Sequence, residues 1–164
     1  MTATALAAVG SNANENGTLL ISGTAVTASG TSVDFTGIPS WAKRITVMLS
    51  GVSTNGTSVP IIQLGDSGGV ETTGYLGSAG GALYTTGVGI ASANAANVIH
   101  GIYRFQNITG NTWVADGNIG LSNGGSNSTA AATKALSDVL DRVRITTVNG
   151  TDAFDAGTIN IMWE

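Results

Sequence analysis

Residues 43–52 read Lys-Arg-Ile-Thr-Val-Met-Leu-Ser-Gly-Val, and this stretch decides the fold class. Ile45, Val47 and Leu49 fall on one face of an extended chain, opposite a face formed by Arg44, Thr46, Met48 and Ser50. A period of two with one apolar face is typical of a half-buried β-strand. The same alternation returns in two later segments, which contain Val143 and Ile145, and Ile159, Ile161 and Trp163.

Turn signals divide the remaining chain into short segments of strand-forming residues. Asn-Gly pairs at 16–17, 55–56, 123–124 and 149–150, and an Asp-Gly pair at 116–117, favour the positive φ angles of tight hairpin turns. We expect strands at 18–27, 31–36, 43–52, 59–65, 70–76, 82–90, 97–108, 111–121, 133–148 with one break, and 157–163. This series predicts an all-β fold, a two-sheet antiparallel sandwich that is jelly-roll-like.

Two segments stand apart from this pattern. Residues 1–17 are small and polar without a sustained period, and we expect them to form an extended N-terminal arm that a neighbouring chain holds in place. Residues 18–164 are then the sandwich domain. Between residues 128 and 141 the sequence fits either a strand or a helix, because the apolar side chains there and just beyond also lie on one helical face: Leu136, Val139, Leu140 and Val143.

Composition excludes several classes of protein. Charged residues make up 10% of the chain and hydrophobic residues 42%, which argues against a disordered chain. The net charge is -4 and no basic cluster is present, so binding to nucleic acid is not expected. No apolar run approaches the length of about 20 residues that a membrane helix needs, so a membrane is not an expected partner. Cysteine is absent, which excludes disulfides and thiolate zinc sites.

Three sequence patterns resemble parts of catalytic or metal sites. Residues 65–69 read GDSGG, like the nucleophile region of trypsin-like proteases, but the only histidine, His100, follows Ser67 instead of preceding it. We interpret GDSGG as a turn after a strand, and the Ser-x-x-Lys pattern at 40–43 as a turn that enters a strand with Trp41 packed. The oxygen-rich loop at 149–157 fits either a calcium site or a plain hairpin loop. No catalytic residue, metal ligand or cofactor is therefore predicted, and the chain is not expected to be an enzyme.

Two stretches of sequence suggest a family. Residues 36–54, TGIPSWAKRITVMLSGVST, and residues 141–164, which begin DRVRITTVNGTDAFDAG, together resemble a β-domain found in proteins of tailed-bacteriophage and prophage virions. The resemblance spans about residues 31–164 and agrees with the jelly-roll-like prediction. It implies a virion protein that is assembled in the cytoplasm of the bacterial host.

The resemblance leaves two functions open. Because only a short arm precedes the domain, a capsid decoration (cement) protein is favoured, which would form a homo-oligomer, trimer or dimer, on the major capsid protein. The alternative is a tail-fibre or tail-tip knob that binds a host receptor and contacts tail proteins. The aromatic side chains expected to anchor these contacts are Trp41, Tyr75, Tyr84 and Trp113, with Tyr75 and Tyr84 in loops. Trp163 is expected in the core because it continues the face of Ile159 and Ile161.

Overall fold

Two antiparallel β-sheets stacked as layers make up the fold in the computed structural model, which describes residues 11–13, 19–90, 92 and 94–164. The large sheet has ten strands and the small sheet has five. In spatial order, the large sheet contains β1 (Ser11–Ala13), β2 (Leu19–Ser22), β15 (Phe154–Trp163), β5 (Arg44–Thr54), β11 (Ile99–Thr109), β12 (Thr112–Leu121), β13 (Asn127–Ala135), β8 (Tyr75–Ala79) and β9 (Ala82–Tyr84), with β3 (Val26–Thr27) also paired to β15. The small sheet contains β10 (Val88–Gly89), β6 (Pro60–Asp66), β14 (Leu140–Thr147) and β4 (Ser32–Thr36), with β7 (Gly69–Val70) paired to β6.

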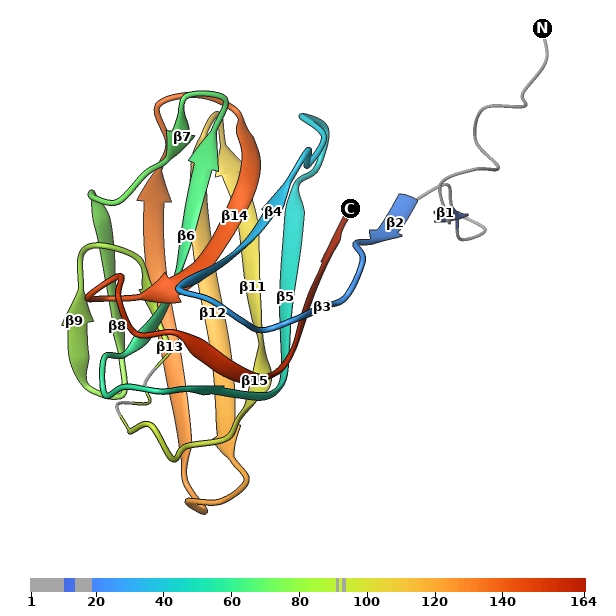
Figure 1. Cartoon of the computed structure of the whole chain (residues 1–164). Coiled ribbons are helices and arrows are strands. Elements are labelled where there is room, and N and C mark those ends of the chain that lie inside the picture. Colours follow the sequence, from blue (N-terminus) through green and yellow to red (C-terminus); the bar gives the residue numbers. More distant parts are fainter. Residues whose placement is uncertain (1–10, 14–18, 91, 93) are drawn as a thin grey trace, which may run out of the picture.

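The hydrophobic core lies between the two sheets, as the alternation of apolar residues requires. Ile45, Val47 and Leu49 of β5 are buried, Ile45 and Val47 at 0% exposure, and burial resumes at Val52 and Thr54 after a break at Gly51. Val143 and Ile145 of β14 reach the core from the small sheet, where they are also 0% exposed. Figure 1 shows β6, β14 and β4 layered over β5, β11, β12 and β13. The predicted all-β sandwich is therefore confirmed, and the finer jelly-roll connectivity stays a prediction.

Residues 128–141 form strand and turn, so the helical alternative was wrong. Strand β13 lies in the large sheet and β14 in the small sheet, and the turn between them carries the chain from one layer to the other. Leu136 and Leu140 are both buried, at 7% and 3% exposure. Their spacing imitates a helical face because both residues point into the core from the two ends of this crossing.

The predicted arm at 1–17 lies mostly outside the described residues, since residues 1–10 and 14–18 are not among them. Its described part, β1, pairs antiparallel with β2 and so extends the large sheet by one strand. The expected boundary between residues 17 and 18 also falls outside the described residues.

The Asp-Gly pair at 116–117 is not a turn, which corrects one prediction. Both residues lie inside β12, and Gly117 pairs with Tyr103 on the neighbouring strand β11. A Cβ atom on Gly117 would lie 2.3 Å from the Tyr103 ring. Gly117 therefore provides space for an aromatic ring, because a strand glycine leaves room that any larger residue would fill.

Candidate functional site on the outer face of the large sheet

The GDSGG sequence forms a turn between β6 and β7, as predicted. The Asp66 carboxylate accepts hydrogen bonds from the Gly68 backbone N–H at 2.8 Å and from the Ser137 hydroxyl at 2.7 Å. Ser67 is exposed in this turn. His100 lies in the large sheet, where its Nδ1 accepts a hydrogen bond from the Gly51 N–H at 3.2 Å and its Nε2 lies 3.2 Å from the Ser122 hydroxyl. The partners of Asp66 and His100 are thus structural groups instead of the members of a catalytic triad.

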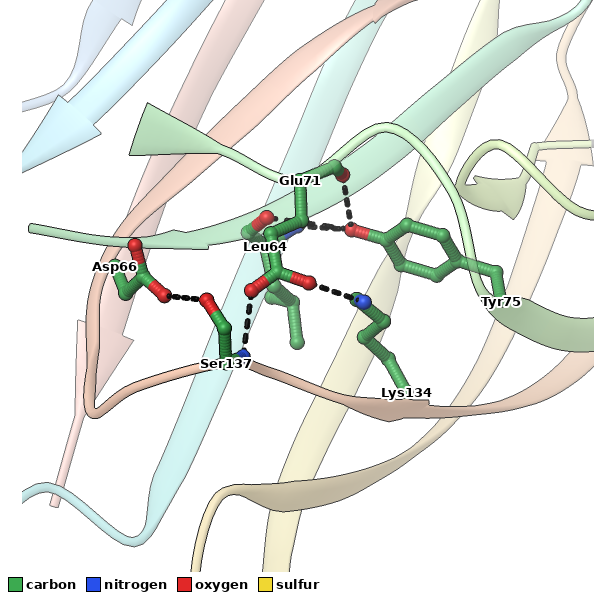
Figure 2. A network of polar contacts seen from close by, with 6 residues as sticks. All are labelled: Leu64, Asp66, Glu71, Tyr75, Lys134 and Ser137. Atoms are coloured by element: carbon green, nitrogen blue, oxygen red, sulfur yellow. Dashed lines mark hydrogen bonds and ion pairs between the residues drawn. The ribbon is translucent and has the colours of Figure 1, made fainter. Parts of the chain in front are cut away.

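A buried polar cluster surrounds this turn and joins the two sheets (Figure 2). Lys134 of β13 forms an ion pair with Glu71, and the exposed fractions of the two side chains are 7% and 22%. The second Glu71 oxygen accepts a hydrogen bond from the Ser137 N–H at 2.6 Å. The Tyr75 hydroxyl accepts a hydrogen bond from the Leu64 N–H at 2.6 Å and lies 3.0 Å from the Glu71 carbonyl oxygen. Because Tyr75 belongs to the large sheet and Leu64 to the small sheet, the cluster holds the layers together.

Electrostatics in the cluster favour charged carboxylates and a neutral tyrosine. Burial alone would raise the pKa of Glu71, but the hydrogen bonds from Lys134 and Ser137 outweigh burial and lower it. Hydrogen bonds from Ser137 and the Gly68 N–H lower the pKa of Asp66. Burial raises the pKa of Tyr75 well above its usual range. Glu71, Asp66 and Tyr75 therefore keep fixed charges and fixed hydrogen bonds, as expected of a cluster that holds the two sheets together.

The lowered pKa of Glu71 predicts acid sensitivity. Its stabilising contribution is fully present above the ordinary value of 4.5 and is lost as the pH falls through the lower pKa of the folded state. We expect the free energy of unfolding to decline with pH below that value, and the decline to be shallower in Glu71→Gln. Urea denaturation followed by tryptophan fluorescence over roughly pH 3 to 7 measures both slopes. Equal slopes in the two proteins would show that Glu71 does not contribute.

The acidic residues of the 149–157 loop bond to the protein itself. Asp152 accepts hydrogen bonds from the Ser58 N–H at 2.8 Å and the Asn149 amide at 2.7 Å, and these bonds lower its pKa. Asp155 instead accepts a hydrogen bond from the Ser53 hydroxyl. Across the part of the chain that the structure describes, no group of three His, Cys, Asp or Glu residues is placed to hold a metal ion.

The four predicted anchors divide into two pairs. Tyr75 and Trp113 are buried, at 0% and 4% exposure, so they are core residues and neither presents a surface anchor. Both were expected at the surface because composition does not reveal which face of a strand an aromatic residue occupies. Tyr84 is half-buried against the core, whereas Trp41 is 44% exposed in the turn before β5 and is not packed as expected. Trp163 is partly buried and packs against the core as predicted.

A broad surface that the sequence did not identify lies on the side of the large sheet that faces away from the small sheet. We call it the outer face. Strand pairing aligns its side chains into rows that cross the sheet, and the central row contains Leu83, Ser78, Ala131, Asp116, Arg104, Thr46, Met162 and Ser22. The rows on either side contain Leu76, Thr133, Val114, Gln106, Arg44 and Glu164, and Thr129, Asn118, Ile102, Met48 and Asn160.

Charge on the outer face cancels within the chain. Its charged residues are two arginines and two carboxylates, paired as Arg44 with Glu164 and Arg104 with Asp116. The second pair is well exposed, with 3.4 Å between Arg104 Nη1 and Asp116 Oδ2. The remaining positions in the three rows are neutral. The net charge of -4 that the whole chain carries therefore lies outside these rows.

Apolar side chains are unusually accessible on the outer face. Leu76 and Leu83, at the β8–β9 edge, are 74% and 85% exposed, and Ile102 near the centre is 43% exposed. A depression of about 390 Å³ lies between the two leucines and is lined mostly by apolar atoms. Leu20, at the opposite edge, is 39% exposed and lines a second depression of about 230 Å³ with Met162. Exposed apolar patches of this kind mark interaction surfaces.

A separate groove of about 490 Å³ lies on the small sheet. Its lining is rich in hydroxyl side chains, namely Thr31, Ser32, Thr72, Thr73, Thr86, Thr146 and Thr147. Arg144 also lines it, held in a bidentate ion pair with Asp34 in which both distances are 2.7 Å. The groove therefore offers neutral hydrogen-bonding groups at its surface.

Comparison of the chain with protein-family models, curated proteins and solved structures finds no match. Among the described residues there is no helix long and apolar enough to cross a membrane.

Proposed function

We propose that the chain is a structural protein of a tailed-bacteriophage virion, a capsid decoration protein that stabilises the head through contacts between subunits. The resemblance of residues 36–54 and 141–164 to phage virion domains supports the viral assignment. The jelly-roll-like connectivity, the homo-oligomer and the contact with the major capsid protein are parts of the same proposal.

The outer face is the observation that carries this proposal. Leu76, Leu83 and Ile102 expose apolar surface there, and the four charged groups are already paired within the chain. A subunit that docks on this face gains apolar burial without leaving an unpaired charge behind. Such a surface serves adhesion, whereas catalysis needs convergent polar groups with perturbed pKa values in a cleft.

Heat stability of the particle tests the decoration function. Particles that carry Leu83→Glu are expected to release DNA at a lower temperature than wild-type particles, because a carboxylate replaces an apolar contact. Their adsorption to host cells should be unchanged. Leu83 is 85% exposed, so the variant should fold normally, and a thermal melt of the isolated chain checks this. Unchanged DNA retention in correctly folded variant particles would contradict the decoration function.

A tail-fibre or tail-tip knob is the second candidate, favoured by the hydroxyl-lined groove and by exposed Trp41. Hydroxyl groups and an aromatic ring are the groups that bind polar, ring-shaped ligands such as sugars. For a knob, Trp41→Ala or a Thr72→Ala/Thr73→Ala double variant would abolish adsorption and leave the heat stability of the particle intact. The decoration function predicts that these variants leave both adsorption and heat stability unchanged, because Trp41, Thr72 and Thr73 lie outside the three rows of the outer face.

A further inference from the structure

We propose that the outer face binds the outer face of a second copy of this chain, about a two-fold axis that passes beside Arg104 and Asp116. This inference rests on the proposed function, in which the chain acts by contacts between subunits, and it identifies the surface and the partner.

The position of Arg104 and Asp116 in the central row suits contact with a second copy. In the central row, Asp116 on β12 and Arg104 on β11 occupy the middle, with β13, β8 and β9 on one side and β5, β15 and β2 on the other. A two-fold axis that runs between β11 and β12 brings together residues that lie equally far on either side of it. Asp116 of one copy then meets Arg104 of the other. The two-fold symmetry makes this contact twice, once from each copy.

The same axis brings the two ends of the rows together. Leu83 and Leu76 occupy the β9 and β8 end. Leu20 and Met162 occupy the β2 and β15 end, where they line one depression. An axis parallel to the strands places the β9 and β8 end of one copy over the β2 and β15 end of its partner, so that Leu83 meets Ser22, Ser78 meets Met162 and Leu76 meets Glu164. The exposed leucines therefore lose solvent exposure beside Leu20 and Met162 without facing them directly.

The net charge of the chain favours the outer face as the surface through which two copies bind. Two copies of a chain with a net charge of -4 repel each other when they approach through their acidic parts. The outer face carries no net charge, so two outer faces approach without that repulsion. Partners of opposite charge gain no electrostatic attraction at a neutral face, which makes a second copy the better fit.

The outer face is also large enough for a stable dimer. With strands about 4.8 Å apart and residues of one face nearly 7 Å apart along a strand, the three rows cover about 620 Å² on each copy. Burial of both faces approaches about 1,240 Å², which lies at the lower end of the range of specific interfaces of about 1,200–2,000 Å². Two twisted sheets that pack face to face align at an angle of about 30°.

Sedimentation velocity of the isolated chain tests this inference. The wild-type chain is expected to be a dimer at about 100 µM, well above the dissociation constant of a micromolar interface. Asp116→Arg places an arginine against Arg104 of the second copy and should raise the dissociation constant at least about a hundredfold. The charge-swapped double variant, Asp116→Arg with Arg104→Asp, restores every pair and should recover the dimer.

Asp34→Arg is the matched control, because Asp34 and Arg144 form an exposed cross-strand pair on the small sheet. This variant should leave the dimer unchanged. A monomeric wild-type chain, a trimer, or a dimer that Asp116→Arg does not weaken would each overturn the inference. If the chain is a monomer that still stabilises particles, its partner lies in the coat and the decoration function stands. If the chain is a dimer that is absent from purified particles, the decoration function alone is contradicted.

Discussion

Replacing Lys134 with methionine is expected to lower the free energy of unfolding by about 3 kcal/mol, at the lower end of what loss of one partner from a buried ion pair costs. Lys134 lies on the core face of β13, and its Nζ stands 5.4 Å from the centre of the Tyr75 ring. Methionine fills a similar volume, so the loss arises mainly from the Glu71 carboxylate, which keeps its bond from the Ser137 N–H but loses its counterion. Glu71 retains partial exposure to water, which limits the cost.

Urea denaturation of Lys134→Met beside Lys43→Met measures this effect. Lys43 is exposed immediately before β5, and its replacement should change the free energy of unfolding by less than about 0.5 kcal/mol. Adding Glu71→Gln to Lys134→Met removes the unpaired charge and should recover part of the loss. Equal stability of the two lysine variants would show that the cluster in Figure 2 does not hold the sheets together.

Replacing Gly157 with valine is expected to destabilise the protein by more than about 3 kcal/mol. Gly157 has a φ of +96°, and a Cβ atom there would lie 2.5 Å from the Gly51 carbonyl oxygen. The position is a bulge, where the pairing of β15 with β5 shifts between Ala156 and Thr158. A branched side chain must therefore strain its own backbone and also push two paired strands apart.

Gly150→Val separates these two causes. Gly150 also has a positive φ, +69°, but a Cβ atom there would have nothing within 4 Å. Its replacement should cost only the backbone strain, about 1–3 kcal/mol, and therefore less than Gly157→Val. Thermal or urea denaturation of the two variants gives the difference. If Gly150→Val is as destabilising as Gly157→Val, the close approach of β15 to β5 is not important for stability.

Local alternation of apolar residues was sufficient to predict the sandwich and strands such as β5, whereas most of β8 and of β13 lies outside the expected strands. Ile45, Val47 and Leu49 were assigned to the core from spacing alone, and they are buried there. The same signal was available for Lys134, since Ala130 and Ala132 place it on the core face, but a lysine is not expected inside without a partner. Its partner, Glu71, lies far away in sequence, and only the fold brings the two together.

The outer face could not be predicted because it depends on register between strands that are distant in sequence. The sequence does not distinguish Asp116 and Ala131 from other strand residues. Only the pairing of β12, β13, β8 and β9 aligns them in one row with Ser78 and Leu83. For the same reason Tyr75 was expected in a loop as an exposed anchor. Its hydroxyl bonds to Leu64 of the other sheet, a contact that no local pattern reveals.

An electron-microscopy map of the phage particle tests the central claim most directly, because that claim concerns contact between subunits. We predict the chain on the head surface, with the outer face of its large sheet covered by the same face of a second copy. A chain located at the tail tip, with its outer face open to solvent and the groove of the small sheet turned toward the host, would contradict this account.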